Sequence, residues 1–461
     1  MESRSEIISQ WVVGVTFDQL PGQVVDLTKL RILDVMGLSI AGRSTPFGRS
    51  VLDSATELYS GSESRLWGTN ARTSASGAAL VNGALSQALE YDDTHNESIV
   101  HISSPSVAAA LALVDKRGGS GRELISSIAI GNEISSRVGS VAPGEVHRRG
   151  FHPTGIFAPF GTAYLAGFLM RSSTDQLRDG AGIVGSLASG LIQCWADGTQ
   201  TKFLHPGWAA MSGIVAATLS QAGMTGPAEV FEGRFGLFAS HLQDQRLALN
   251  LDRLTLDLGS SWESLNASFK PFPAAHVIHP YIDALLRLRE RSALRPSDVR
   301  RITCKVAPYI VGIVCEPVSE KRRPATDSQG RVSLQYTLAE AFALGSLGRR
   351  SYGENTLRDP EVLSLADRVD YEVDESFPGP QQFKGVVRVE LNDGRFLEEV
   401  EEHNRGSKQN PMSDASVIGK FRENVGGVLS PDQADKIIEA VLSLERLEQA
   451  SAITDLAISD D

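Results

Sequence analysis

Histidine and lysine are the residue types in this 461-residue sequence whose placement could do chemistry, because they are scarce and clustered. The chain has nine histidines, and lysine supplies 10 of its 44 basic residues. Seven of the histidines fall in four short stretches: His95–His101, His147–His152, His205 and His276–His279. Two of the lysines, Lys202 and Lys270, lie in apolar or histidine-containing segments rather than in charge runs. Clusters of titratable groups in apolar surroundings are where acid–base chemistry and anion binding are expected.

The first chemical segment, residues 89–105, follows an apolar helical stretch. It places seven polar side chains where a helix end needs one cap: Glu90, Asp92, Asp93, Thr94, His95, Glu97 and His101. This concentration is typical of a site, although a solvated helix end would have the same composition. The two adjacent aspartates would suit a divalent metal, but their spacing gives no octahedral oxygen cage, so we predict no metal site.

Two further segments place basic residues beside the starts of apolar helices. His152 and Thr154 precede a glycine-rich helix whose N-terminal N–H groups would attract carboxylates, although a simple capping turn fits equally. Lys202 and His205 lie between two apolar helices. A lysine close to apolar walls can bind a carboxylate or act as a base, whereas the alternative is a surface lysine whose stem covers apolar groups.

The fourth segment, residues 266–283, lies at a predicted domain boundary. Here Lys270, His276 and His279 flank a turn with two prolines. Clefts between domains are preferred ligand sites, and the alternative is an interdomain hinge with incidental basic residues. Together the four segments supply Lys and His groups, acidic partners and helix N-termini. This mixture suits an anionic, carboxylate-bearing substrate and acid–base chemistry without an organic cofactor.

The elements that must position these segments are mainly helical. Apolar stripes with helical spacing predict helices over 26–42, 77–93, 105–118, 120–139, 157–171, 176–193 and 207–222. After about residue 266, alternating patterns predict strands in 300–314 and 368–373 and a hairpin over 383–403 that turns at Asn392-Asp393-Gly394. Helices are predicted between them at 279–294 and 333–348, and after them from Ser413 and over 431–447.

This order predicts a multidomain α and α+β protein, with a large all-α helical domain and a smaller inserted α+β lid domain. The helical domain takes residues 1–266, the α+β lid domain takes residues 267–400, and residues 401–461 return to the helical domain. Small residues on the helix faces permit close helix–helix approach, which favours a compact bundle.

The composition excludes several classes of protein. A net charge of −12 and a pI of 5.3 argue against nonspecific nucleic-acid binding. No apolar run approaches the ~18 residues that span a bilayer, and the N-terminus lacks a basic region followed by an apolar stretch. Three sparse cysteines, Cys194, Cys304 and Cys315, fit a reducing compartment and no zinc module. We therefore predict a cytoplasmic protein without membrane or nucleic-acid partners, and the absence of a phosphate loop predicts no nucleotide.

Stretches from the whole chain resemble one known family. They are LRILDVMGLSIAG, LEYDDTHNESIVH, FHPTGIFAPFGTA, TQTKFLHPGWAAMSGIVAA, FKPFPAAH and SLQYTLAEAFALG. In this order they resemble the MmgE/PrpD family, whose members include 2-methylcitrate dehydratase, cis-aconitate decarboxylase and iminodisuccinate epimerase. The resemblance implies a homodimer, a site in the cleft between the two domains, and no metal or nucleotide.

The resemblance also implies the residues of the site. Positions implicated in decarboxylase-like members match Asp93, Thr94, His101, His152, Lys202, Lys270 and His276, and Tyr309 looks like the family's tyrosine in the lid domain. Two positions depart from that pattern, because Glu90 stands where the decarboxylase-like members have Asp and Ile102 stands where they have Pro. The geometry at a reacting carbon is sensitive to such changes.

The sequence therefore predicts a cofactor-independent lyase acting on a small di- or tricarboxylate. A 2-methylcitrate dehydratase-like reaction comes first, with proton abstraction alpha to a carboxylate and loss of water. An iminodisuccinate epimerase-like isomerase and a cis-aconitate decarboxylase-like lyase are the alternatives, and a carboxylate-binding scaffold is the alternative outside enzymes.

Our mechanistic hypothesis divides the site into two sets of roles. Lys202, Lys270 and either His205 or His152 bind substrate carboxylates, and Thr94 forms a hydrogen bond to the substrate. His101 and His152 form the acid–base pair. Asp93 orients His101 or tunes its pKa.

Overall fold

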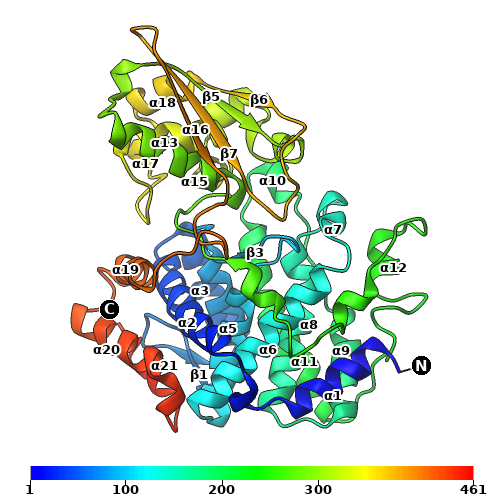
Figure 1. Cartoon of the computed structure of the whole chain (residues 1–461). Helices are drawn as coiled ribbons and strands as arrows, with labels where there is room; N and C mark the ends of the chain where they lie inside the picture. The colour runs from blue at the N-terminus through cyan, green and yellow to red at the C-terminus, as the bar shows by residue number, and fades with distance from the viewer. Residues whose placement is uncertain (1, 460–461) are drawn as a thin grey trace.

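The computed structural model describes residues 2–459, which form a helical part and a sheet part (Figure 1). The helical part contains α1 Arg4–Gly14, α2 Gly22–Gly42, α3 Pro46–Leu58, α4 Ala75–Gln87, α5 Ser103–Arg117, α6 Gly121–Gly139, α7 Glu145–Arg148, α8 Pro153–Leu169, α9 Thr174–Gly185, α10 Cys194–Asp197, α11 His205–Gln221, α12 Leu237–Leu242, α19 Asp414–Val425, α20 Pro431–Leu442 and α21 Ala452–Asp455. Its strands are two residues long: β1 Ser64–Arg65, β2 Arg72–Thr73, β3 Thr94–His95 and β4 Ala267–Ser268. The sheet part contains α13 His279–Arg291, α14 Val318–Arg322, α15 Asp327–Arg331, α16 Leu334–Leu344, α17 Glu354–Leu357, α18 Pro360–Ala366, β5 Val299–Val306, β6 Val369–Val373, β7 Gly385–Leu391 and β8 Phe396–Glu401.

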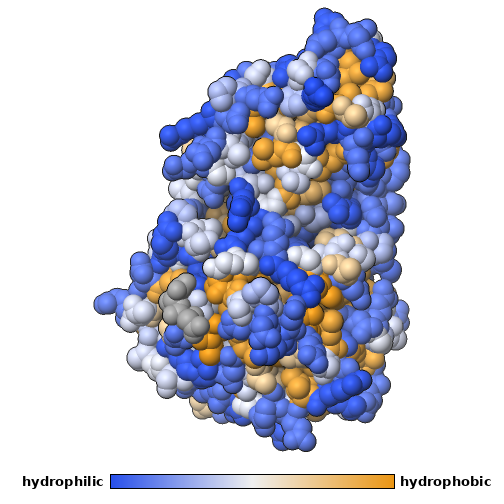
Figure 2. Space-filling model, turned by 90° about the vertical axis from the view of Figure 1, so that its left-hand side faces the viewer, coloured by the Kyte–Doolittle hydropathy of each residue, from blue (hydrophilic) through white to orange (hydrophobic). Residues whose placement is uncertain are grey.

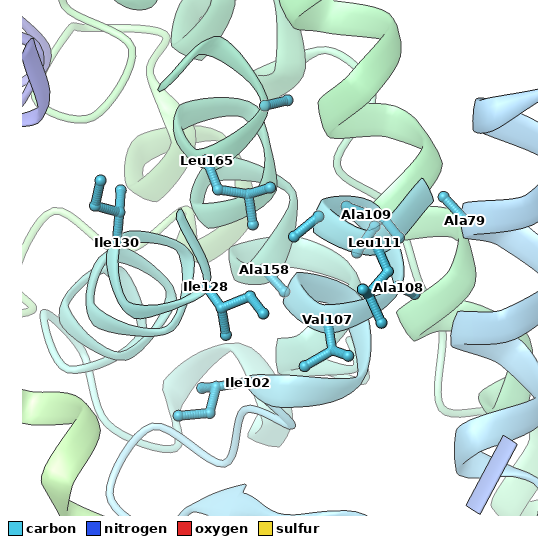
Figure 3. Packing of buried hydrophobic residues seen from close by; sticks show 14 of the residues in the cluster. Ala79, Ile102, Val107, Ala108, Ala109, Leu111, Ile128, Ile130, Ala158 and Leu165 are labelled. Atoms are coloured by element: carbon cyan, nitrogen blue, oxygen red, sulfur yellow. The ribbon is translucent and has the colours of Figure 1, made fainter. Parts of the chain in front are cut away.

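Small residues let the long helices of the helical part pack closely. Figure 3 shows Val107, Ala108 and Leu111 of α5 among side chains of α6 and α8. At the contact of α6 with α8, a Cβ on Gly161 would lie 2.2 Å from the carbonyl oxygen of Gly131. Any larger residue at this crossing would force the two helices apart.

Local signals in the sequence set many of the helix ends. Ser120 and Glu123 form a capping box at the start of α6, and Ser413 caps α19 as predicted. Other predicted helices are shorter than expected. The helix over 176–193 ends at Gly185, because the chain then turns so that Ser189 and Gly190 form backbone hydrogen bonds with the start of α8. The helix over 431–447 ends at Leu442 and a separate 3₁₀ turn follows it.

The sheet part is built on a four-stranded sheet with the order β6-β5-β7-β8. Strands β5 and β6 are parallel and the other pairs are antiparallel, so the predicted hairpin at residues 383–403 is confirmed as β7 and β8. The strand predicted over 300–314 ends at Val306, because the chain enters helical turns at Pro308–Ile310 and Val311–Cys315. Proline lacks the N–H that would continue the sheet.

Two separate hydrophobic clusters stabilise the two parts. The larger cluster draws on residues from Ile8 to Ala267 and again from Phe421 to Ala457. The second draws on residues from Phe272 to Leu391. Both ends of the chain therefore belong to the helical part, where α19 and α20 pack against α2 (Figure 1).

One face of the molecule shows how polar and apolar residues are distributed on the surface. The face in Figure 2 is mostly hydrophilic, with hydrophobic patches on both parts of the molecule. Among residues 2–459, no helix is long and apolar enough to cross a membrane.

Candidate active site

A cavity of about 760 Å³ lies between the helical part and the sheet part. Seven of the nine predicted site residues line it: Thr94, His101, His152, Lys202, Lys270, His276 and Tyr309. The other two, Asp93 and His205, lie behind the lining and contact the residues that form it. The structure thus brings together side chains that are up to 215 residues apart in sequence (Thr94 to Tyr309).

A short strand pair joins the first and fourth chemical segments. Thr94 pairs with Ser268 and His95 pairs with Ala267 across β3 and β4. This pairing places Lys270 beside the residues that follow α4. The helix predicted over 77–93 ends at Gln87, so the acidic residues after it are free to turn into the site.

Glu90 is the centre of the charged floor of the cavity, and the sequence placed it in the first chemical segment without giving it a role. Its backbone has a φ of 53°, in the left-handed region that a non-glycine residue enters at some cost in energy. Lys202 Nζ lies 2.5 Å from both carboxylate oxygens of Glu90. Lys270 Nζ donates to the Glu90 carbonyl oxygen at 3.1 Å and to Oε1 at 3.2 Å.

Burial and charge together set the ionisation of this triad. Burial alone would raise the pKa of Glu90, but Lys202 and Lys270 outweigh it and hold the pKa well below the usual range. Burial lowers the pKa of Lys270, although Glu90 and Asp92 oppose the shift. Because Glu90 is anionic between two lysines, the floor is far less positive than the two lysines alone would make it.

The side-chain carboxylate beside His101 is that of Asp92, whereas Asp93 contacts His101 through its backbone carbonyl oxygen. Asp92 Oδ1 lies 3.2 Å from His101 Nδ1. The side chain of Asp93 instead accepts hydrogen bonds from the backbone N–H and the hydroxyl of Ser103, at the start of α5, and lies 3.4 Å from Arg31. Neither carboxylate lines the cavity, and each reaches the site through the residues that it contacts.

His101 is held from both sides. Its Nδ1 lies 3.0 Å from the carbonyl oxygen of Asp93, and its backbone N–H donates to Thr154 Oγ1 at 3.0 Å. Burial would raise the pKa of Asp92, but His101 and Lys270 hold the pKa below its usual range. An anionic Asp92 orients the imidazole through Nδ1 and leaves Nε2 as the nitrogen that can act in the cavity.

His152 is the second imidazole of the floor. It is the N-cap residue of α8, and its ring centroid lies 5.6 Å from that of His101. Its Nδ1 lies 2.9 Å from His205 Nδ1, so one of the two rings donates to the other. Burial, His205 and Lys202 lower the pKa of His152 well below its ordinary value, so the ring is neutral at pH 7. His205, a predicted substrate-binding residue, positions His152 in this geometry.

The sheet part contributes the other predicted residues. His276 accepts a hydrogen bond at Nε2 from the side-chain amide of Asn404 at 2.9 Å, and burial lowers its pKa well below the ordinary value. Its Nδ1 is buried and has no hydrogen-bond partner among the described residues. Tyr309 lines the cavity from the 3₁₀ turn at Pro308–Ile310 and is 37% exposed.

Arg331, at the end of α15, links the two parts at the floor and was not identified from the sequence. Its Nη1 donates to the carbonyl oxygens of Leu89 and Pro273, both at 3.0 Å, and its own carbonyl oxygen accepts from Ala275 N–H. These contacts fix the backbone next to Glu90 and between Lys270 and His276. A single arginine in a short helix gives no pattern from which this role could have been predicted.

The same cavity contains three further residues that the sequence did not single out: Asn96, His147 and Trp195. Burial and Lys202 lower the pKa of His147 to about 4. Its position within the 147–152 histidine cluster was the available signal. Among residues 2–459, no group of three or more His, Cys, Asp or Glu side chains is arranged to hold a metal ion.

Comparisons with known proteins match nearly the whole chain. The family model of the MmgE/PrpD N-terminal domain matches residues 6–250, and that of the MmgE/PrpD C-terminal domain matches residues 272–446. A cis-aconitate decarboxylase of Aspergillus terreus is 26% identical over 97% of this chain and 94% of its own length. The cis-aconitate decarboxylase of Homo sapiens is 28% identical over 99% of this chain and 95% of its own length. A 2-methylcitrate dehydratase of Cupriavidus necator is 25% identical over 38% of each chain.

Proposed function

The chain belongs to the MmgE/PrpD family of enzymes, and from that premise we propose that it is a cofactor-independent lyase acting on a small di- or tricarboxylate. The observation that carries the proposal is the pair His101 and His152. The two rings lie 5.6 Å apart in the cavity, and each Nδ1 is engaged by a positioning group, Asp92 or His205. Two imidazoles held in this way can serve as base and acid on opposite sides of one substrate carbon.

Each residue of the floor has a role in this proposal. Lys202 and Lys270 bind substrate carboxylates, with Glu90 as the counter-ion that holds both ammonium groups in place. For dehydration, His152, which is neutral at pH 7, takes a proton from the carbon alpha to a carboxylate, and His101 protonates the leaving hydroxyl. For decarboxylation no proton is abstracted, and one of the two histidines protonates the carbanion that CO2 leaves behind. Thr94 forms a hydrogen bond to the substrate.

Decarboxylation of a cis-aconitate-type acid leads among the possible reactions. The relatives that align with 97% or more of this chain are named as cis-aconitate decarboxylases. In that reaction the C–C bond to one carboxylate breaks, CO2 leaves, and the electron pair left on carbon takes a proton from a histidine. Dehydration of a 2-methylcitrate-type acid is the second candidate, because the same pair supplies a base for the alpha proton and an acid for the leaving hydroxyl.

The test follows candidate acids by NMR in D2O. We expect cis-aconitate to lose CO2 and its product to contain one carbon-bound deuteron taken from the solvent. Alkene formation from 2-methylcitrate would assign the dehydratase reaction instead, and exchange of an alpha proton without product would indicate an epimerase. If calorimetry shows that these acids bind but NMR shows neither proton exchange nor turnover, the lyase proposal is overturned in favour of a carboxylate-binding protein.

A further inference from the structure

The cavity is larger and more apolar than a small polycarboxylate requires. Most of the charged and imidazole groups lie on the floor formed by the helical part, whereas His276, Tyr309 and Glu375 belong to the sheet part. Cavities of about 300–1,000 Å³ hold drug-sized ligands, and this one measures about 760 Å³. A citrate-sized acid that contacts both lysines and both histidines would fill only a minor part of that volume.

The remaining wall is apolar and comes from the sheet part. It is formed by Val277, Pro308, Ile313, Val332, Phe377 and Phe383, which we call the apolar wall. Four of these side chains, those of Val277, Ile313, Val332 and Phe377, are half-buried. Apolar surface of this kind lowers the free energy of a complex only when a ligand with apolar groups covers it.

The polar floor also limits how many carboxylates can bind. Glu90 already neutralises one of the two ammonium charges, and burial keeps His152 and His276 uncharged at pH 7. A substrate with a carboxylate at every end would place charge against the apolar wall, where the cost of desolvating that charge would weaken binding. A substrate with its carboxylates at one end and an apolar group at the other fits both surfaces.

We propose that the preferred substrate is a di- or tricarboxylic acid that carries an alkyl substituent several carbons long. Its carboxylates bind at Lys202 and Lys270, its reacting carbon lies between His101 and His152, and its alkyl chain lies along the apolar wall. This inference rests on the proposed function and adds the substrate class to it.

The test compares acids that differ only in chain length. We measure kcat/KM for cis-aconitate and for a series of its alkyl-substituted homologues from methyl to hexyl, together with the corresponding 2-alkylcitrates. Each methylene that leaves water for the apolar wall should raise kcat/KM about threefold to fourfold until the wall is covered. Binding of unreactive 2-alkylsuccinates, measured by calorimetry, should tighten by the same factor and does not depend on turnover.

Two variants locate the effect on the wall. Phe377→Ser and Ile313→Ser should each reduce the ratio of kcat/KM for the hexyl acid to that for the unsubstituted acid by about tenfold. Phe377 lies outside the hydrophobic cluster of the sheet part, so its variant should keep the fold. Val373→Ser is the matched control, because Val373 is an exposed residue of β6 outside the cavity, and it should leave the ratio unchanged.

The outcomes separate the two proposals. Turnover of the unsubstituted acid with no gain, or a loss, on adding carbons would overturn the alkyl-chain inference and leave the lyase proposal standing. A chain-length effect that Phe377→Ser and Ile313→Ser leave intact would also overturn it, because the chain would then bind elsewhere. If no acid is turned over, the lyase proposal is overturned. If the alkylsuccinates then bind equally tightly whatever the length of their alkyl chain, the alkyl-chain inference is overturned as well.

Discussion

The floor and the apolar wall of the cavity differ in how their side chains are held. On the floor, Glu90, Lys202, Lys270, His101 and His152 are each 5% exposed or less and are held by ion pairs or hydrogen bonds. On the wall, Pro308 is exposed, and Ile313 and Phe377 are half-buried. The floor is therefore preorganised for charge and proton transfer, whereas the wall selects by shape and apolar contact.

The difference has a physical cause in the elements that carry the two surfaces. The floor residues lie at the ends of long helices or beside the β3–β4 pair, and a network of buried partners fixes each of them. The wall residues lie on helical turns and on the loop before β7, and Val277, Ile313 and Val332 are only partly buried against the hydrophobic cluster of the sheet part. Substitutions on the floor should therefore affect chemistry and stability strongly, and substitutions on the wall should change mainly the choice of substrate.

The largest expected effect is the loss of turnover when the floor loses an imidazole. His152→Ala should lower kcat/KM by about 10²- to 10⁴-fold, because a positioned general base or acid contributes about that factor. Tyr309→Phe, which keeps the ring on the opposite side of the cavity, should lower it by less than about tenfold. Steady-state kinetics on the same acid provides the comparison. If His152→Ala turned over like the wild type, His152 would have no part in the reaction.

The second effect is on stability and compares a buried ion pair with an exposed one. Glu90→Gln leaves Lys202 and Lys270 buried without their counter-ion and should lower the free energy of unfolding by about 3–5 kcal/mol. Glu398→Gln breaks the exposed pair with Arg388 across β7 and β8, and should cost about 1 kcal/mol or less. Urea denaturation measures both. Equal losses in the two variants would contradict the idea that the floor is the more constrained region.

The smallest effect is the pH dependence that the buried histidines of the floor impose on stability. Burial, with Lys202, lowers the pKa of His205 from 6.5 to about 4, so between these values the unfolded chain binds the proton and the folded chain does not. Stability is therefore lost as the pH falls from 6.5 towards 4, at about 1.4 kcal/mol per pH unit for this one group. The free energy of unfolding, measured by urea denaturation at pH 7, 6 and 5, should fall less steeply with decreasing pH for His205→Gln than for the wild type. Identical slopes would show that His205 does not carry this dependence.

The local structure was largely predictable because it depends on neighbours in sequence. The capping box of Ser120 and Glu123, the cap at Ser413 and the turn at Asn392-Asp393-Gly394 each fix an element through contacts within a few residues. The segments that form the cavity could also be identified, because titratable residues are costly to bury and stand out from apolar surroundings.

The roles of individual side chains within those segments were decided by tertiary structure. Glu90 meets Lys202 across 112 residues and Lys270 across 180 residues, so no spacing in the sequence could reveal that one carboxylate neutralises both lysines. The placement of the Asp92 carboxylate, rather than that of Asp93, beside His101 has the same origin, because the direction of the extended segment before β3 is set by α5 and by the pairing with β4. Residue type and local pattern determined which titratable groups the chain brings to the site. The packing of distant elements decided which of these groups face one another. It therefore also decided their charges and pKa values, because these depend on burial and on the distance to each partner.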